Sequence, residues 1–350
     1  MDQDTEFGKQ FAVAILNYAP YGIQGPYVGN KVYENLGPFR EHFDEIEVEV
    51  RLFGDGGDTV RVKQSPQERE VFVPHFYYAP SAAQHTMIGT QVAGALHRAG
   101  ARKVYFLETY NPYYRQDCRS PAKREAVAAR QVADFYVHSG VDRVLVFDPH
   151  FRQLEGFFPD RYPMVSLDLT EKFAGYLFRH HRDAIERADF IGCATDDGSV
   201  RITKRLMRVL NKELARDTAL YIARLDKDRI AEEEDVITTN AIFGEVRGRN
   251  IIIREDVIGT GTTAEKSVKT LRDVGAGDIW VVATYVGNVP PERLEYFRKE
   301  KIKIITTDGI PRGVNQDFSV MEIPPIASRI ISRTVRRKSL SEYMAKLDVE

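Results

Sequence analysis

Along the whole chain, short apolar runs of strand length alternate with segments in which apolar residues recur at helical spacing. Predicted strands lie at 11–16, 47–53, 60–63, 70–76, 104–107, 143–147, 190–194, 219–225, 250–253, 280–284 and 302–306, and predicted helices at 82–99, 122–139, 200–214, 264–274 and 290–299. The runs at 47–53 and 60–63 flank a turn rich in Gly and Asp, which indicates a β-hairpin. Elsewhere the alternation of strand and helix predicts an α/β fold with mostly parallel sheets.

The chain has 350 residues, enough for one large or two medium domains. Two connections are alike: residues 96–105 and 271–280 both end a helix, turn at a glycine and enter a strand. This similarity hints that one α/β unit is duplicated. We expect an N-terminal domain at 1–162, a C-terminal domain at 163–330 and a C-terminal tail or helix at 331–350.

Composition narrows the class of protein. A formal net charge of -2 argues against a general nucleic-acid binder, and no apolar run approaches the length of a membrane span. The acidic N-terminus lacks a signal-peptide pattern. Only Cys118 and Cys193 are present, too few for a disulfide framework or a zinc cluster, so both are expected to be reduced, with an inert Cys118 favoured over a reactive one. The expected protein is cytoplasmic, with small-molecule substrates and neither a nucleic-acid nor a membrane partner.

The segment 251–263 carries the most specific chemistry. A buried strand ends in Glu255 and Asp256, a Gly/Thr loop follows at 259–263, and a helix begins. Backbone N–H groups at a helix N-terminus bind anions, Thr hydroxyls donate to phosphate oxygens, and carboxylates accept from a sugar diol. A phosphate site beside a site for a sugar diol matches ribose 5-phosphate. The structural alternative is an ordinary strand–turn–helix, and the segment is no P-loop because Gly-Lys-Ser/Thr is missing.

Other motifs extend the pattern over most of the chain. Residues 126–158 run from a helix through Gly-Val-Asp-Arg-Val to a strand ending Asp-Pro-His and then to Gln-Leu-Glu-Gly-Phe-Phe. Residues 113–117 read Tyr-Tyr-Arg-Gln-Asp, 226–229 read Asp-Lys-Asp-Arg, and 307–311 read Thr-Asp-Gly-Ile-Pro. In this order, and with the loop at 255–263, the chain resembles the ribose-phosphate pyrophosphokinases, also called PRPP synthetases.

This resemblance implies two tandem phosphoribosyltransferase-type domains with Rossmann-like, mostly parallel sheets, in a homo-oligomer from dimer to hexamer. It implies transfer of diphosphate from ATP to the anomeric hydroxyl of ribose 5-phosphate, with Mg²⁺ as cofactor, ATP as co-substrate and AMP as a product. Lys227 and Arg229 would be catalytic. By the same resemblance, the residues expected to bind ATP are Phe53, Asp58, Arg115, Gln116, Asp117 and His150. The residues expected to bind Mg²⁺ are His150 and Asp196. The residues expected to bind the ribose phosphate are Asp196, Glu255, Asp256, Gly259, Thr260, Gly261, Thr262 and Thr263.

Several positions depart from the family pattern. Glu255 and Gly259 replace two Asp residues, and Thr262 replaces a Gly, which would strain the backbone if that position needs a positive φ. An aromatic, Gly/Pro-rich loop occupies 17–27, where it could line the site or pack on itself. These departures motivate the hypothesis that the acceptor is ADP-ribose, giving ADP-ribose 1-diphosphate and a place in NAD metabolism, with ribose 5-phosphate slightly favoured.

Two other classes share parts of this pattern. A phosphoribosyltransferase that consumes PRPP would have the loop at 259–263, and a non-catalytic regulatory subunit would have the fold. The first has no use for the motif at 113–117 or for Lys227 and Arg229. The second often lacks that pair. Their presence together favours the active diphosphokinase.

Overall fold

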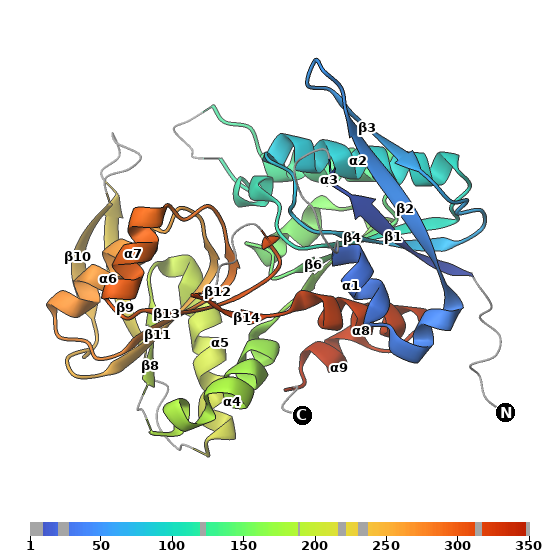
Figure 1. Cartoon of the computed structure of the whole chain (residues 1–350). Coiled ribbons are helices and arrows are strands. Elements are labelled where there is room, and N and C mark those ends of the chain that lie inside the picture. Colours follow the sequence, from blue (N-terminus) through green and yellow to red (C-terminus); the bar gives the residue numbers. More distant parts are fainter. Residues whose placement is uncertain are drawn as a thin grey trace. The chain divides into compact units, whose positions relative to one another are not determined.

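The computed structural model describes residues 10–19, 28–119, 124–187, 190–215, 222–229, 237–311 and 317–347, without the side chains of 226–229 and 237–241. The protein divides into two compact units (Figure 1). The first comprises Met1–Leu167 and Glu322–Ser341, and the second Asp168–Met321 and Glu342–Glu350. Within the part of the chain that the structure describes, no helix is both long and apolar enough to cross a bilayer.

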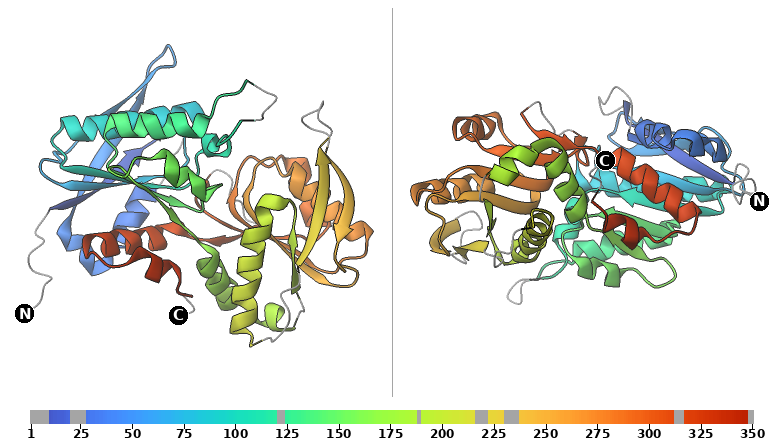
Figure 2. Two further views of the ribbon diagram at one scale, coloured as in Figure 1. Left: turned by 180° about the vertical axis from the view of Figure 1, so that it is seen from behind. Right: turned by 90° about the horizontal axis from the view of Figure 1, so that it is seen from below.

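A seven-stranded sheet forms the centre of the first unit, in the order β3-β2-β1-β4-β5-β6-β7. Its strands are β1 (Phe11–Asn17), β2 (Phe43–Leu52), β3 (Asp58–Val62), β4 (Glu70–His75), β5 (Lys103–Glu108), β6 (Arg143–Phe147) and β7 (Met164–Leu167). Only β3, among these described strands, is antiparallel to its neighbour. Helices α2 (Ala82–Arg98) and α3 (Ala128–Ser139) cover one face, and α1 (Val28–Glu34) and α8 (Ile323–Val335) cover the other (Figures 1 and 2). The 3₁₀ helices η2 (Gly37–His42), η3 (Pro112–Arg115) and η4 (Arg152–Phe157) lie in the connections.

Burial explains which runs form the central strands. All of β1 up to Leu16 is buried, as is β4 from Val71 onward, because helices cover both faces of the sheet. Toward the edge, β2 instead alternates buried and partly exposed positions. Its antiparallel pairing with β3 confirms the hairpin predicted from the two runs around the Gly-rich turn.

The second unit repeats this architecture, with a seven-stranded sheet in the order β10-β9-β8-β11-β12-β13-β14. Its strands are β8 (Phe190–Ala194), β9 (Ile222–Arg229), β10 (Ile237–Phe243), β11 (Asn250–Ile258), β12 (Ile279–Val286), β13 (Lys303–Thr307) and β14 (Ser319–Met321). Its helices are α4 (Thr170–Arg187), α5 (Asp197–Glu213), α6 (Thr262–Asp273) and α7 (Pro291–Lys299), and the short α9 (Leu340–Met344) follows α8 near the end of the chain. Ile251, Val268, Leu271 and Val281 belong to one buried cluster that joins β11 and β12 to α6.

The two sheets have the same topology: a central parallel set and an antiparallel hairpin strand at one edge. This confirms the predicted fold class of two α/β units with mostly parallel sheets. It also gives a structural reason for the similar α-to-β connections at 96–105 and 271–280, which join α2 to β5 and α6 to β12.

The units differ in detail from the ranges 1–162, 163–330 and 331–350. The short strand β7 pairs with β6 and therefore belongs to the first sheet. Helix α8 belongs to the first unit, where the Ser328 hydroxyl donates to the carbonyl of Val32 at 2.7 Å. A contact across 296 positions leaves no local pattern in the sequence, which is why the last part of the chain looked like a separate tail.

Candidate functional site

The turn after β5 carries three of the expected nucleotide-binding residues. Asn111 caps η3, and its Oδ1 accepts a hydrogen bond from the backbone N–H two residues later at 3.1 Å. Arg115 and Gln116 are exposed, whereas Asp117 is buried and accepts a hydrogen bond from Gln153 Nε2 at 2.7 Å. The turn thus presents a guanidinium and an amide on a tethered backbone, which suits contacts to phosphate and base.

His150 follows the neighbouring strand β6. Because β5 and β6 are parallel neighbours, the turn 115–117 and His150 lie at the same edge of the sheet. Asp148, between β6 and His150, has a φ of 41°, a left-handed value that is uncommon for a residue with a side chain. Strained backbone of this kind concentrates at functional sites. The structure therefore groups four of the six expected ATP contacts at one edge of the first sheet.

Phe53 and Asp58 lie elsewhere, in the hairpin formed by β2 and β3. Phe53 is 54% exposed in the turn, and Asp58 accepts a hydrogen bond from Gln91 of α2 at 2.7 Å. In the sheet order β2 is three strands from β5, about 14 Å at ordinary strand spacing. The first unit of one chain therefore does not bring the hairpin tip to the 115–117 turn.

In the second unit, Asp196 begins α5. Its Oδ1 accepts a hydrogen bond from the backbone N–H of Ser199 at 2.8 Å, and the Ser199 hydroxyl reciprocates by accepting from the Asp196 N–H at 3.2 Å. These two reciprocal hydrogen bonds form a capping box at the N-terminus of α5. Because the cap uses one oxygen of an exposed carboxylate, Asp196 keeps a second oxygen for a ligand.

The Gly/Thr loop 259–263 joins β11 to α6. Gly261 is the N-cap of the helix with a φ of 80°, and Thr262 is the first helical residue. The left-handed position is thus Gly261, and the Cβ of Thr262 causes no strain. The hydroxyls of Thr260 and Thr262 lie 3.1 Å apart beside the first N–H groups of α6. Backbone N–H groups in the first turn of a helix and threonine hydroxyls are donors that suit an anion, so this loop is a candidate anion site.

Arg293 of α7 supports the loop, a role that the sequence did not reveal. Its Nη1 donates to the carbonyl of Thr260 at 2.6 Å, and its Nε donates to Glu265 at 2.5 Å. The side chain is 19% exposed. Because Arg293 lies one helix further along the chain, no local motif connects it with the loop.

Glu255 and Asp256 lie within β11, since this strand continues to Ile258 instead of ending at 253. Both side chains are half-buried. The carboxylate of Glu255 accepts a hydrogen bond from the hydroxyl of Thr195, the residue before Asp196. The structure therefore places the carboxylate of Glu255 beside the start of α5.

Arg254 is a buried cation next to these carboxylates, with 1% of its surface exposed. Its Nη2 donates to the hydroxyl of Thr284 at 2.8 Å, and its guanidinium lies 4.7 Å from the ring centre of Phe173. Through these contacts the buried guanidinium of Arg254 joins β11 to β12 and to α4. Sequence reasoning missed it because a single Arg after an apolar run looks like the exposed end of a strand.

Lys227 and Arg229 lie in β9, where their backbones pair with Thr239 and Ile237 of β10. The predicted strand at 219–225 ended before both residues, whereas in the structure β9 continues to Arg229 and pairs antiparallel with β10. The acidic run 232–235 lies outside the described residues, as does the aromatic loop at 17–27 beyond Ala19.

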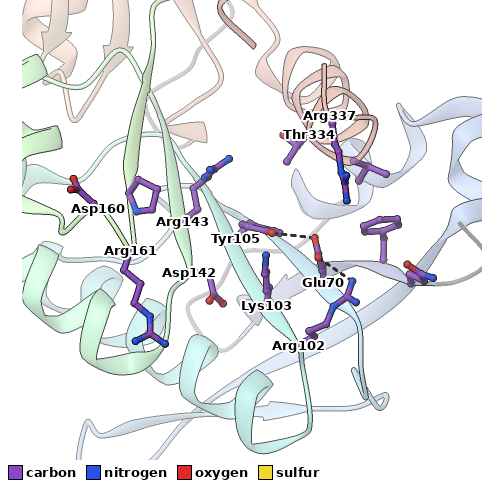
Figure 3. A pocket seen from close by; sticks show the side chains of 14 residues that line it. Glu70, Arg102, Lys103, Tyr105, Asp142, Arg143, Asp160, Arg161, Thr334 and Arg337 are labelled. Carbon is purple, nitrogen blue, oxygen red and sulfur yellow. Dashed lines mark hydrogen bonds and ion pairs between the residues drawn. The ribbon is translucent and has the colours of Figure 1, made fainter. Parts of the chain in front are cut away.

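A cavity of about 580 Å³ lies at the opposite edge of the first sheet, where β1, β4, β5 and β6 begin (Figure 3). Glu70 accepts hydrogen bonds there from the hydroxyl of Tyr105 at 3.1 Å and from Arg102 at 3.0 Å. Asp142 and Asp160 also line it, among four other basic side chains. Since acidic and basic groups face the cavity together, it lacks the one-sided charge of an anion site.

Cys118, next to the 115–117 turn, is exposed. The negative charge of Asp117 and a hydrogen bond to it raise the pKa of the Cys118 thiol. This is the opposite of thiolate activation and agrees with the inert thiol favoured from the sequence.

The chain is similar to known proteins along most of its length. Residues 22–140 match the family model for the N-terminal domain of ribose phosphate pyrophosphokinase. The ribose-phosphate pyrophosphokinase of Bordetella parapertussis is 30% identical over 301 residues, which cover 85% of this chain and 90% of that protein. The protein of the same name from Mycobacterium leprae is 28% identical over 82% of this chain and 83% of its own length.

A solved structure shows the same fold. The phosphoribosylpyrophosphate synthetase of Mycobacterium smegmatis superposes with a TM-score of 0.75 at 23% identity, covering 94% of this chain and all of that one. Both units are therefore shared with this relative.

Proposed function

The chain belongs to the ribose-phosphate pyrophosphokinase family, and from this premise we propose that it transfers the β,γ-diphosphate of Mg-ATP to the C1 hydroxyl of ribose 5-phosphate. Membership makes the protein a diphosphokinase-type enzyme. The observation that carries the choice of acceptor is the 259–263 loop, a candidate anion site at the start of α6 that directly follows two half-buried carboxylates. A sugar 5-phosphate and its diol match this pair of features.

The reaction needs positioning and charge neutralisation more than covalent catalysis. The C1 hydroxyl oxygen bonds to the β-phosphorus, and the bond from that phosphorus to the oxygen bridging to the α-phosphate breaks. AMP leaves with the bridging oxygen, and the hydroxyl proton passes to solvent. In our proposal Thr260–Thr263 hold the 5-phosphate, Glu255 and Asp256 hold the ring hydroxyls, and Arg115–Asp117 with His150 hold ATP.

Lys227 and Arg229 are proposed to neutralise the charge that develops on the transferred diphosphate. Positioned cations of this kind accelerate phosphoryl transfer by about a thousandfold or more. Both lie in β9 of the same unit as the 259–263 loop, which we call the acceptor loop.

The donor set fits Mg²⁺ bound largely through substrate. In the second unit Asp196 offers the carboxylate oxygen that its cap does not use, and in the first unit His150 offers an imidazole; each is proposed separately as a contact of the Mg-ATP complex. Mg²⁺ retains waters and takes few protein ligands, so one carboxylate beside the phosphates suffices. When bound, Mg²⁺ would offset the negative charge of the phosphates.

The comparisons name enzymes of ribose phosphate and lend no support to ADP-ribose, so ribose 5-phosphate is the proposed acceptor. ADP-ribose remains a finer hypothesis that rests on Gly259, where the loss of a carboxylate reduces repulsion toward a more anionic 5-substituent. We further propose a cytoplasmic homo-oligomer. Leu52 and Phe53, 43% and 54% exposed at the hairpin tip, support an apolar contact with a second copy.

The test is AMP formation from Mg-ATP with ribose 5-phosphate or ADP-ribose as sole acceptor, with product masses determined. The proposal expects AMP and a diphosphorylated ribose 5-phosphate. If the protein uses ADP-ribose no better than ribose 5-phosphate, the hypothesis that ADP-ribose is the acceptor is rejected. If neither acceptor yields AMP, the regulatory-subunit or phosphoribosyltransferase interpretation replaces the proposal.

A further inference from the structure

We propose that Glu108, buried at the end of β5, is a positioning residue that anchors the ATP-binding turn 113–117 through Tyr114 and Asn111. This inference rests on the proposed function, because it assigns a support to the turn that the proposal gives to ATP. The comparisons and the sequence motifs assign Glu108 no role.

The carboxylate of Glu108 is completely buried. Its Oε2 accepts a hydrogen bond from the hydroxyl of Tyr114 at 2.5 Å, and its Oε1 accepts one from Tyr136 of α3 at 2.7 Å. Asn111 Nδ2 adds a longer contact of 3.4 Å. Among the described residues no Lys or Arg pairs with this carboxylate. A buried carboxylate that is held by neutral donors is costly unless its hydrogen bonds are well formed.

Two buried imidazoles complete the surroundings of Glu108. Nδ1 of His75 lies 3.5 Å and Nε2 of His85 3.4 Å from its Oε1. Burial by itself would raise the pKa of Glu108, but the contacts with both imidazoles outweigh it and hold the pKa well below the usual range. The hydroxyl of Tyr114 donates to this carboxylate. Gly89 of α2 makes room, since a Cβ there would lie 2.8 Å from the ring of His75.

The same side chains have the spacing of metal ligands, because one donor atom from each lies within 4.8 Å of the others. Their orientation does not suit a shared ion. The rings of His75 and His85 stack with centroids 4.0 Å apart and planes inclined by 8°. Ring lone pairs lie in the ring plane, so two parallel rings cannot both direct a nitrogen at one metal. The geometry therefore favours a hydrogen-bonded anchor.

The anchor reaches the turn at two points. Tyr114, 3% exposed, lies inside η3 directly before Arg115. Asn111 caps the same 3₁₀ helix with its Oδ1, while its Nδ2 donates to the hydroxyl of Thr86 at 3.2 Å. A third tether, from the Ala129 N–H to the carbonyl of Gln116 at 3.2 Å, holds the far end. With its backbone held, the turn can present exposed Arg115 and Gln116 to a ligand at low entropic cost.

Two isosteric variants separate positioning from stability. Tyr114→Phe and Tyr136→Phe each delete one hydroxyl that donates to the same buried carboxylate, so both should lower Tm to a similar extent. Only Tyr114 belongs to the turn. We expect Tyr114→Phe to raise KM for ATP about tenfold, the loss of one hydrogen bond to a charged group, while KM for the acceptor stays near wild type. Tyr136→Phe should leave both KM values within about twofold.

Equal rises of KM for ATP in both variants, or none in Tyr114→Phe, would overturn the proposal. If Tyr114→Phe does not fold, Thr86→Val removes one of the two contacts of Asn111 Nδ2 and should raise KM for ATP by about threefold. Direct titration with a non-hydrolysable ATP analogue separates the two proposals. If the wild-type protein binds the analogue but forms no AMP, the proposed function is refuted, and the two Phe variants can still be compared by their affinity for the analogue. If the wild-type protein does not bind the analogue, both proposals are overturned.

A metal analysis tests the alternative that these side chains bind an ion. If the purified protein contains one equivalent of zinc and the His85→Ala variant contains none, the cluster is a metal centre and the proposed anchor is wrong.

Discussion

The acceptor loop offers a paired test at the two ends of α6. Gly261 precedes the helix with a φ of 80°, and Gly275 follows it with a φ of 86°. Replacing either by Ala forces a side chain into the left-handed region, at a cost of about 1–2 kcal/mol. The surroundings differ. A Cβ on Gly275 would meet Arg247 at an ordinary 3.5 Å, whereas a Cβ on Gly261 would lie 2.9 Å from Cδ of Arg293.

Arg293 must therefore move in Gly261→Ala, and its 2.6 Å hydrogen bond to the carbonyl of Thr260 is disturbed. Losing that bond costs about 1 kcal/mol beyond the backbone term, and it releases the loop proposed to hold the 5-phosphate. We expect KM for ribose 5-phosphate to rise about tenfold in Gly261→Ala and to stay near wild type in Gly275→Ala.

The assay combines acceptor KM from AMP formation with Tm from thermal unfolding. Gly275→Ala should lose about 2–8 °C in Tm and Gly261→Ala about 4–12 °C, since each kcal/mol shifts a unit of this size by about 2–4 °C. Equal KM values in the two variants, measured well below both Tm values, would refute the assignment of the loop to the acceptor. If only KM for ATP rises in Gly261→Ala, the loop binds the nucleotide instead of the acceptor.

Three further predictions address other parts of the protein. Lys227→Ala should lower kcat about a thousandfold while the oligomeric state measured by light scattering is unchanged, and normal turnover would remove this residue from catalysis. The rate at which iodoacetamide alkylates Cys118 should rise at a higher pH than for a free cysteine, because the charge of Asp117 raises the thiol pKa, and fast alkylation at pH 7 would contradict this. Burial lowers the pKa of His85 from 6.5 to about 4, so the unfolded state binds more protons between these values and stability should fall as pH drops through this window. His85→Gln should flatten Tm against pH between 6.5 and 4, and an unchanged slope would show that His85 does not carry this dependence.

Local patterns in the sequence predicted much of the fold for physical reasons. The apolar runs at 70–76 and 280–284 are strands covered on both faces, and such strands are readable without knowledge of their partners. The hairpin around Gly56 and Gly57 was visible because two runs flank a turn of residues that favour it. The motifs after β5 and β6 were assigned to ATP by resemblance, and the parallel pairing of these two strands brings them to one edge of the sheet.

What the sequence did not show depends on contacts between distant segments. Arg293 and Arg254 support the acceptor loop and the end of β11 from elements that carry no motif of their own. Helix α8 joins the first unit through its contact with Val32. Glu108 looked like the polar end of a strand, and only the convergence of Tyr114 and Tyr136 on its carboxylate reveals an anchor.

The central claim is tested most directly by supplying Mg-ATP with ribose 5-phosphate as the sole acceptor and measuring AMP and the mass of the second product. We expect equal amounts of AMP and of ribose 5-phosphate carrying one added diphosphate. ADP with a singly phosphorylated sugar would contradict diphosphate transfer, and absence of any product with either ribose 5-phosphate or ADP-ribose would contradict the enzymatic assignment itself.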